Sequence, residues 1–181
     1  SIQIFLGASP NTLLIRNIKG SMHEGRTMYA AWGGRLGSVS WNKGGRAEMK
    51  THYDVIVVGG GPGGIASAVA AAREGVDVLL VERYGFLGGG ATAMLVNPFM
   101  TFFAGDKQII VGIFQEMLDR LSEMGAYGTK DEPMAFDAEA FKIAAERLCL
   151  EAGVELMYHA FLAAGEVSDG KIQSIRIATK A

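Results

Sequence analysis

Hydrophobic positions from residue 53 onward alternate between short apolar runs and helical periods, a pattern typical of α/β proteins. The β-branched run at 55–58 stops at glycine, as a strand buried on both faces does. Residues 63–73 place small apolar side chains at helical spacing, and Gly75 follows as a stop signal. Residues 76–81 are a second apolar run. The pattern predicts a strand, a helix and a second parallel strand.

Two longer helices are predicted next. Apolar side chains recur at helical spacing over residues 109–124, and Gly125 ends that period. A further helix is expected over 137–152, where Asp137 can cap the N-terminus. Both predicted helices have an apolar face that must pack against the rest of the domain.

The last part of the chain predicts a third parallel strand and a hairpin. The strand covers 154–158, and the hairpin joins 161–167 to 171–179 through the turn sequence Ser-Asp-Gly at 168–170. The order strand, helix, strand, helical insertion, strand, hairpin indicates a dinucleotide-binding α/β layout. We expect a parallel sheet with helices on both faces.

The first 48 residues have a different character. No amphipathic period persists there beyond a few residues and glycines interrupt it repeatedly, so no stable element is predicted. This segment holds six basic and two acidic residues, whereas the remainder holds 11 basic and 17 acidic ones. We therefore divide the chain into residues 1–48, a leader or extension, and residues 49–181, the folded domain.

Length, charge and cysteine content exclude several classes of partner and ligand. A length of 181 residues favours one domain, and a net charge of −2 argues against a nucleic-acid partner. The longest uncharged stretch, 84–105, is interrupted by glycines and is not expected to span a membrane. The single cysteine, Cys149, cannot form an internal disulfide, and no zinc-type Cys/His spacing occurs. We therefore expect no metal site. We expect the protein to occur in a reducing, cytoplasmic setting.

A glycine motif lies between the first predicted strand and helix. Gly59, Gly61 and Gly64 have the spacing GxGxxG, with Pro62 and Gly63 between the last two. The first glycine permits a tight turn, the second lets backbone approach a diphosphate, and the third permits close packing of helix on strand. The N–H groups and dipole of the helix would favour that anion.

An acidic residue ends the second strand. Glu82 follows Gly64 by 18 residues, where a dinucleotide site uses a carboxylate to accept hydrogen bonds from the adenosine ribose. A carboxylate there also repels the additional 2′-phosphate of NADP. Glycine turn and acid together predict a nucleotide that contains both adenosine and a diphosphate.

Residues 52–181 resemble the N-terminal part of FAD-dependent oxidoreductases of the glutathione-reductase-like flavoprotein superfamily. The residues that carry the resemblance are the segment 53–64, the pair Glu82-Arg83 and the segment 87–92 with the sequence Leu-Gly-Gly-Gly-Ala-Thr. The resemblance implies FAD as the cofactor and a Rossmann-like FAD/NAD(P)-binding fold with a β-hairpin or meander.

The resemblance also implies positions along the cofactor. Arg83, together with the loop that contains Gly89, Gly90 and Thr92, would lie along the adenosine diphosphate and the flavin. Main-chain atoms near Leu162 would meet the adenine. The loop supports this independently, because a chain without Cβ atoms can pass close to a flat ring and a threonine offers a hydroxyl.

The chain also departs from the disulfide reductases of that superfamily. Those enzymes carry a redox cysteine soon after the double glycine, where Ala91 and Thr92 stand here, so dithiol chemistry is not supported. Cys149 is interpreted as a buried, inert thiol. The aromatic and methionine residues of 94–103 are interpreted as core, with contact to a flavin or substrate as the alternative. No acid, base or nucleophile is assigned as catalytic.

The leading interpretation is an FAD-dependent oxidoreductase that acts on a small-molecule substrate. An NAD-binding dehydrogenase with the same glycine motif and a nucleotide-binding module without catalysis remain alternatives. The resemblance implies a further strand with an Ala-Thr-Gly-like turn after the hairpin, so the domain is expected to be incomplete at its C-terminus. An uncovered sheet edge would then favour marginal stability or association into a homo-oligomer.

The N-terminal division generates a prediction. Lys43-Gly44-Gly45 can be encoded by AAA-GGA-GGN, a purine run like a bacterial ribosome-binding site, three codons before Met49. We expect the protein made by its own host to begin at Met49. Mass spectrometry of that protein checks this, and peptides containing Trp32 or Trp41 would contradict it.

Overall fold

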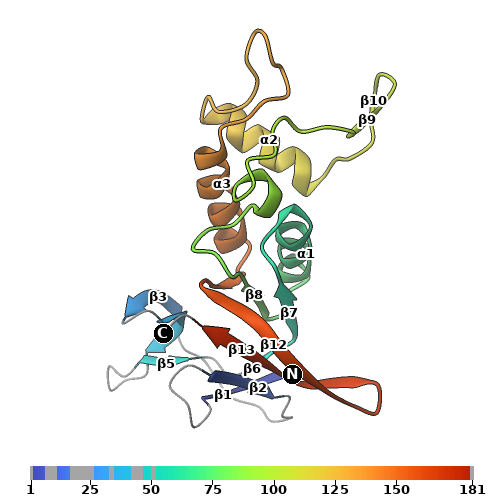
Figure 1. Ribbon diagram of the computed structural model, residues 1–181. Coiled ribbons are helices and arrows are strands. Elements are labelled where there is room, and N and C mark those ends of the chain that lie inside the picture. Colours follow the sequence, from blue (N-terminus) through green and yellow to red (C-terminus); the bar gives the residue numbers. More distant parts are fainter. Residues whose placement is uncertain are drawn as a thin grey trace.

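The computed structural model describes residues 2–6, 12–16, 27–32, 35–41, 47–49 and 52–179. In the region from residue 52 the elements are β6 (His52–Tyr53), β7 (Val55–Val58), α1 (Pro62–Arg73), β8 (Val78–Val81), η1 (Gly89–Ala91), β9 (Phe103–Ala104), β10 (Lys107–Gln108), α2 (Ile113–Glu123), α3 (Ala138–Glu151), β11 (Glu155–Met157), β12 (Ala160–Ser168) and β13 (Lys171–Thr179). In Figure 1, α1, α2 and α3 lie above β7, β8, β12 and β13.

The centre of the domain is a parallel sheet with the strand order β11-β8-β7. Val58 at the end of β7 pairs with Val81 of β8, and Val81 pairs with Met157 of β11. All four residues of β8 are buried, because this strand lies between the other two. The order corresponds to one half of a dinucleotide-binding fold, as the sequence pattern predicts. In this sheet the carboxyl ends of β7 and β8 meet at one edge.

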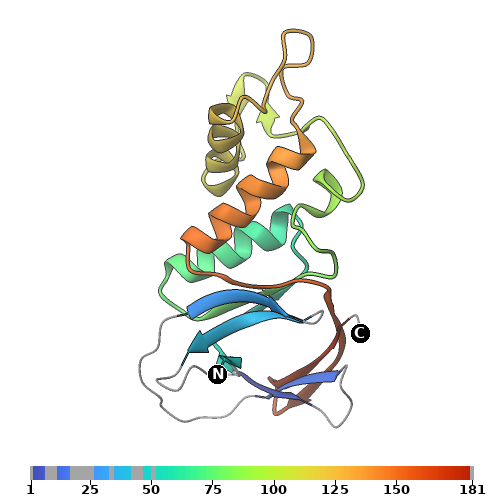
Figure 2. The same ribbon diagram turned by 90° about the vertical axis from the view of Figure 1, so that its left-hand side faces the viewer.

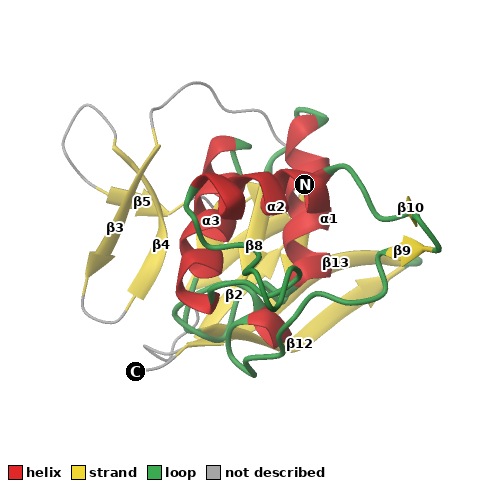
Figure 3. Cartoon of the chain, turned by 90° about the horizontal axis from the view of Figure 1, so that it is seen from above, coloured by secondary structure: helices red, strands yellow, loops and turns green. Residues whose placement is uncertain are grey.

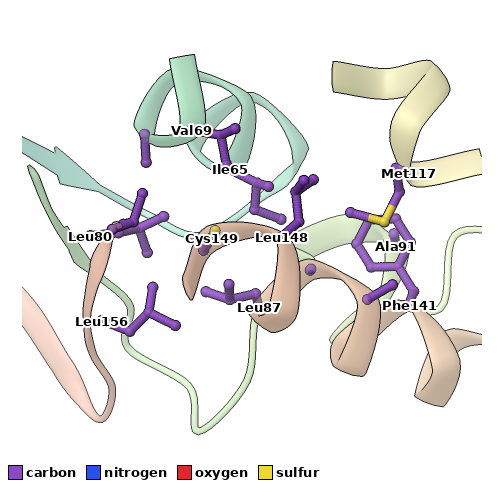
Figure 4. Close-up of a cluster of buried hydrophobic side chains, with 14 of the residues drawn as sticks. Ile65, Val69, Leu80, Leu87, Ala91, Met117, Phe141, Leu148, Cys149 and Leu156 are labelled. Carbon is purple, nitrogen blue, oxygen red and sulfur yellow. The ribbon is translucent and has the colours of Figure 1, made fainter. Parts of the chain in front are cut away.

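Helices cover one face of this sheet. Their buried side chains form a single cluster with alternate residues of β8 and β11, which Figure 4 shows. The small residues Ala68 and Val69 of α1 and Ala145 of α3 have no exposed surface, so these helices lie close to the strands. Figure 3 shows α1 and α3 side by side on the same face. Cys149 belongs to this cluster, which confirms its interpretation as a buried thiol.

Strands cover the opposite face, and this corrects the expectation of helices on both faces. Leu79 and Val81 of β8 pack there with Met157, Ile175 and Ile177 in a second buried cluster. In the described part of the chain the antiparallel pair β12–β13 therefore takes the place expected for helices, as the layers in Figure 2 show. The pair can do so because alternate residues of β13 are apolar and face the sheet.

The hairpin turn and the α3 cap agree with the sequence. Ser168 pairs with Lys171, and the two residues between them, Asp169 and Gly170, have positive φ values of 52° and 71°. These values suit the tight turn that Asp-Gly favours. At the start of α3, Asp137 accepts hydrogen bonds from the N–H groups of residues 139 and 140 at 2.8 and 2.9 Å.

The helix predicted over 109–124 is shorter than expected. It begins at Ile113, because Gly112 before it has φ 67° and ψ −126°, which is outside the helical region. Ile109 and Ile110 lie before the helix and are about half exposed. Their apolar character continued the periodic pattern, so the pattern alone could not place the boundary. The ion pair Arg73–Glu116, with both contacts at 2.7 Å, joins α2 to α1.

Short strands also occur in the N-terminal region, where no element was predicted. They are β1 (Ile2–Leu6), β2 (Thr12–Arg16), β3 (Thr27–Trp32), β4 (Arg35–Trp41) and β5 (Ala47–Met49). Strand β2 pairs with β13 in antiparallel orientation, and β3, β4 and β5 form a sheet of their own. The assignment of residues 1–48 as a leader or extension stays a prediction. Among the described helices, none has the length and apolar character to cross a membrane.

Candidate cofactor site

A pocket of about 290 Å³ opens at the carboxyl ends of β7 and β8. Its walls come from the glycine turn, the segment after β8, the 3-10 helix η1 and the start of β12; the lining residues are Val58, Gly59, Val81, Glu82, Arg83, Tyr84, Gly89, Gly90, Ala93, Met94, Ala160 and Phe161. This edge of a parallel α/β sheet is where nucleotides bind. The structure thus brings Glu82, Arg83, Gly89 and Gly90 to one place, as the sequence predicted.

The N-terminus of α1 lies beside this pocket and is not capped by a side chain. Gly61 is the N-cap and Pro62 is the first helical residue, which lacks an N–H group. The first intrahelical bond runs from the N–H of Ile65 to the carbonyl of Gly61 at 2.9 Å. The N–H groups of Gly63 and Gly64 precede that bond, so they lack an intrahelical acceptor. Uncapped N–H groups at the positive end of a helix suit an anion.

The three motif glycines have separate reasons to be glycine. Gly59 has φ +100°, a conformation that L side chains rarely adopt. A Cβ at Gly64 would lie 1.8 Å from the Gly59 carbonyl oxygen, so the start of α1 contacts the turn directly. A Cβ at Gly61 would instead find its nearest heavy atom, the Cα of Gly89, 4.0 Å away. Packing within the protein therefore accounts for Gly64, whereas it does not account for Gly61.

The loop after β8 is tied to the glycine turn by backbone contacts. The N–H of Gly88 donates to the carbonyl of Gly60 at 2.7 Å. A Cβ at Gly89 would lie 2.9 Å from the Cα of Gly61, so only glycine fits there without a shift. The two glycine-rich segments approach so closely because neither carries side chains at the contact. Together they form a narrow, backbone-lined wall beside the pocket.

Thr92 does not face the pocket, which corrects the expectation that its hydroxyl is offered to a cofactor. Its side chain is buried, and Oγ1 donates to the carbonyl of Leu87 at 2.8 Å. A Cβ at Gly88 would lie only 2.3 Å from the Thr92 side chain. Thr92 therefore packs into its own loop and fixes the turn through Gly88. The spacing of the motif cannot distinguish this orientation from one toward a ligand.

Glu82 lines the pocket and is 5% exposed. Its Oε2 accepts the N–H of Gly60 at 2.6 Å, and its Oε1 accepts the N–H of Tyr84 at 2.8 Å. Each carboxylate oxygen has a second lone pair, so both can still accept a ligand hydroxyl. The two backbone donors compensate for the burial of this charge and orient the carboxylate before any ligand binds.

Arg83 and Tyr84 form the pocket wall next to Glu82. Arg83 donates an N–H to the Tyr84 hydroxyl at 2.6 Å, and its guanidinium carbon lies 4.7 Å from the centroid of the Tyr84 ring. The hydrogen bond to Tyr84 raises the pKa of Arg83 above its usual value, so the guanidinium stays charged. Sequence reasoning identified Arg83 but missed Tyr84. Its position directly after the Glu-Arg pair was the available signal.

The β12 side of the pocket lies slightly before the predicted contact. Ala160 and Phe161 line the pocket, whereas Leu162 does not and has 43% of its surface exposed. The segment near Leu162 is therefore close to the pocket, and the contact of its main-chain atoms with the adenine stays a prediction.

The segment 94–103 divides between core and surface, which partly corrects its interpretation as core. Phe99 stacks on Phe136 with ring centroids 4.1 Å apart, and Phe102 is buried. Met94 lines the pocket and is 71% exposed, and Met100 is 65% exposed. The sequence favoured the core for Met94 over the alternative of a flavin or substrate contact, because methionine fills cores as readily as it lines ligand sites.

Two other chemically notable residues, Cys149 and His159, are not among those that line the pocket. Burial, with a smaller contribution from Glu146, raises the pKa of the Cys149 thiol to about 12, so little thiolate forms at neutral pH. The N–H of His159 donates to the carbonyl of Tyr84 at 3.1 Å, which gives this residue a structural role. Across the described residues, no three His, Cys, Asp or Glu side chains gather where they could hold a metal ion.

Comparison with known proteins finds short matches of high identity to a reductase and to a transhydrogenase. A stretch of 35 residues is 66% identical to digeranylgeranylglycerophospholipid reductase 2 of Methanococcoides burtonii, and covers 19% of this chain and 9% of that protein. A stretch of 46 residues is 50% identical to the soluble pyridine nucleotide transhydrogenase of Hamiltonella defensa, and covers 24% of this chain and 10% of that protein. The matched stretches thus span about a tenth of each relative.

Solved structures give more distant matches. THI4 of Thermovibrio ammonificans superimposes with a TM-score of 0.47 at 24% identity, over 70% of this chain and 48% of that one. The myxobacterial chondrochloren halogenase CndH, an FAD-dependent halogenase, gives a TM-score of 0.47 at 21% identity, over 69% of this chain and 32% of that one.

The family comparison covers most of the chain. The match extends over residues 54–181 and so includes the glycine turn, Glu82, the loop after it and the hairpin. The family is that of the FAD dependent oxidoreductases, which confirms FAD as the expected cofactor and oxidoreductase as the expected class. The narrower likeness to glutathione reductase stays a prediction. On this match, the chain belongs to the FAD dependent oxidoreductase family.

Proposed function

We propose that residues 53–179 form the part of an FAD-dependent oxidoreductase that binds the adenosine diphosphate half of FAD. The observation that carries the proposal is the open space in front of Gly61, where a Cβ would meet nothing closer than 4.0 Å. It adjoins the uncapped N-terminus of α1. Space for a ligand and unpaired N–H donors coincide there, and a diphosphate needs both.

The other residues follow from this placement. With the diphosphate at Gly61, Pro62, Gly63 and Gly64, the carboxylate of Glu82 would accept hydrogen bonds from the ribose hydroxyls. Its orientation is already set by its bonds to the N–H groups of Gly60 and Tyr84. Arg83 would lie at the adenosine end of the pocket. Gly89 and Gly90 would face the far side of the diphosphate, toward the flavin.

FAD, when bound, supplies hydride transfer to or from the substrate. The residues of this chain hold the cofactor, orient it and exclude water from one side of it. The apolar residues of the pocket wall are Val58, Val81 and Phe161. They suit a heteroaromatic base better than a highly charged group. The substrate is proposed to be a small molecule. We propose neither a nucleic-acid partner nor a membrane partner. We also propose a cytoplasmic location and self-association into a homo-oligomer.

The proposed function predicts the cofactor of the purified protein. We expect it to carry FAD, with the visible absorption of an oxidised flavin, and to be reduced by an electron donor. Titration of the apoprotein should give a higher affinity for FAD than for FMN or NAD, because only FAD joins adenosine to a flavin through a diphosphate. A colourless protein that binds NAD more tightly than FAD would contradict the proposal.

Replacing Gly61 tests the diphosphate position. Gly61 has φ −73° and ψ 177°, which alanine adopts without strain, so Gly61→Ala should change the free energy of unfolding by less than about 1 kcal/mol. Its methyl group would occupy the space of the diphosphate, so FAD affinity should fall by at least about tenfold, or 1.4 kcal/mol. Fluorescence titration and thermal unfolding of the apoprotein check both.

Gly64→Ala is the matched control. Its Cβ would lie 1.8 Å from the Gly59 carbonyl oxygen, so this variant should lose stability even without FAD. Wild-type FAD affinity in a folded Gly61→Ala variant would place the diphosphate elsewhere.

Replacing Glu82 tests the ribose contact and its support. Glu82→Ala leaves the buried N–H of Gly60 and the partly buried N–H of Tyr84 without their acceptor, and an unsatisfied buried donor costs about 1–3 kcal/mol of stability. We expect a lower unfolding temperature and at least about tenfold weaker FAD binding. Glu82→Gln keeps one acceptor oxygen and should be the more stable variant. A folded Glu82→Gln protein with unchanged FAD affinity would reject the ribose contact.

A further inference from the structure

A series of four side chains runs from the pocket into the helical layer. Arg83 lies over the Tyr84 ring, with its guanidinium carbon 4.7 Å from the centroid. Tyr84 stacks on Phe86 with centroids 5.6 Å apart and planes 10° apart. Lys142 of α3 lies over Phe86, its Nζ 4.2 Å from the centroid. We call this arrangement the Arg-Tyr-Phe-Lys array. Only its first two members line the pocket.

Hydrogen bonds hold the backbone of Tyr84 through both its N–H and its carbonyl group. Its N–H donates to Glu82 Oε1 at 2.8 Å, and its carbonyl accepts the N–H of His159 at 3.1 Å. The next residue, Gly85, is so close to the His159 ring that a Cβ would lie 2.9 Å from it. The backbone that carries the Tyr84 ring is therefore held in place by hydrogen bonds, and the ring itself stacks on Phe86.

The side chain of Arg83 is held less firmly than the backbone of Tyr84. It is exposed, and its hydrogen-bond partner in the structure is the Tyr84 hydroxyl, at 2.6 Å. A free arginine side chain has many rotamers, and ordering it costs conformational entropy. The contact with Tyr84 restricts those rotamers before a ligand arrives, and leaves available most of the five N–H donors and the face of the guanidinium that is turned away from the Tyr84 ring.

We propose that Tyr84 is a positioning residue that holds the guanidinium of Arg83 in place to contact the adenosine of FAD. The proposal rests on the proposed function and adds a residue to it. A guanidinium plane stacks well on a heteroaromatic base, and a preordered one loses less entropy on binding. Glu82, on the other side of Arg83, would bind the ribose of the same nucleoside. Adenosine would thus be recognised by adjacent residues of one segment.

The test compares two tyrosine hydroxyls. Tyr84→Phe removes the acceptor for Arg83 and keeps the ring on Phe86. Tyr158→Phe makes the same chemical change at a tyrosine that does not line the pocket and whose hydroxyl donates to Glu146 at 2.8 Å. The affinities of the purified full chain for FAD, ADP and FMN are measured by titration, together with the unfolding temperature of each apoprotein. FMN serves as the probe that contains the flavin but no adenosine.

We expect Tyr84→Phe to weaken FAD and ADP binding by about three- to tenfold and to leave FMN binding and the unfolding temperature unchanged. Arg83→Ala should weaken FAD at least as much, and the double variant should bind FAD no more weakly than Arg83→Ala alone. Tyr158→Phe should lower the unfolding temperature and leave the ratio of FAD to FMN affinity unchanged.

Three outcomes would overturn the proposal. They are unchanged FAD affinity in Tyr84→Phe, equal weakening of FAD and FMN, and additive effects of the Tyr84 and Arg83 substitutions. A wild-type chain that bound no FAD would overturn the proposed function as well. FAD binding by the wild type with any of the three outcomes would overturn only the role of Tyr84.

Discussion

The bridge that Glu82 makes between the ends of β7 and β8 is the interaction on which the site depends. A buried carboxylate is costly unless hydrogen bonds replace its water shell, and here two backbone N–H groups do so. One belongs to Gly60 in the turn after β7 and the other to Tyr84 in the segment after β8. The same carboxylate therefore fixes the position of both segments. Glu82 also lines the pocket that these segments enclose.

Close packing of backbone supports this bridge. The Gly88 N–H donates to the Gly60 carbonyl, and Gly89 contacts Gly61 without an intervening side chain. Leu87, the residue before Gly88, is completely buried. A Cβ at Gly60 would lie 2.4 Å from the Leu87 side chain. The loop is thus anchored by one large apolar residue and shaped by glycines around it. An anchored loop loses little entropy when a ligand binds, which favours tight binding.

The helical layer extends this order away from the pocket. Ion pairs join α1 to α2 through Arg73–Glu116 and α2 to α3 through Arg120–Glu151. These pairs are partly exposed and contribute little stability, so the buried cluster beneath them supplies most of it. Phe141 of α3 belongs to that cluster, and Lys142 beside it reaches the ring of Phe86. The site and the core are therefore connected through α3.

The sequence by itself determined the order β7, α1, β8, α2, α3, β11, β12 and β13, the glycine turn and the strand-end acid Glu82, whereas η1, β9 and β10 were not predicted. Local patterns suffice for these features, because apolar runs, helical spacing and glycine turns follow from backbone geometry. The family comparison confirms the inference of FAD that Glu82-Arg83 and the glycine loop support. The Asp137 cap and the Asp-Gly hairpin turn were predictable for the same local reason.

Only the tertiary structure decided which side chains face the pocket and what covers each face of the sheet. Thr92 matches the glycine-loop motif yet faces inward, whereas Tyr84 and Met94 match no motif yet line the pocket. The strands β12 and β13 cover the face where helices were expected, and α2 begins at Ile113 because Gly112 has a non-helical backbone. These outcomes depend on contacts between segments distant in sequence, and a periodic pattern contains no information about such contacts.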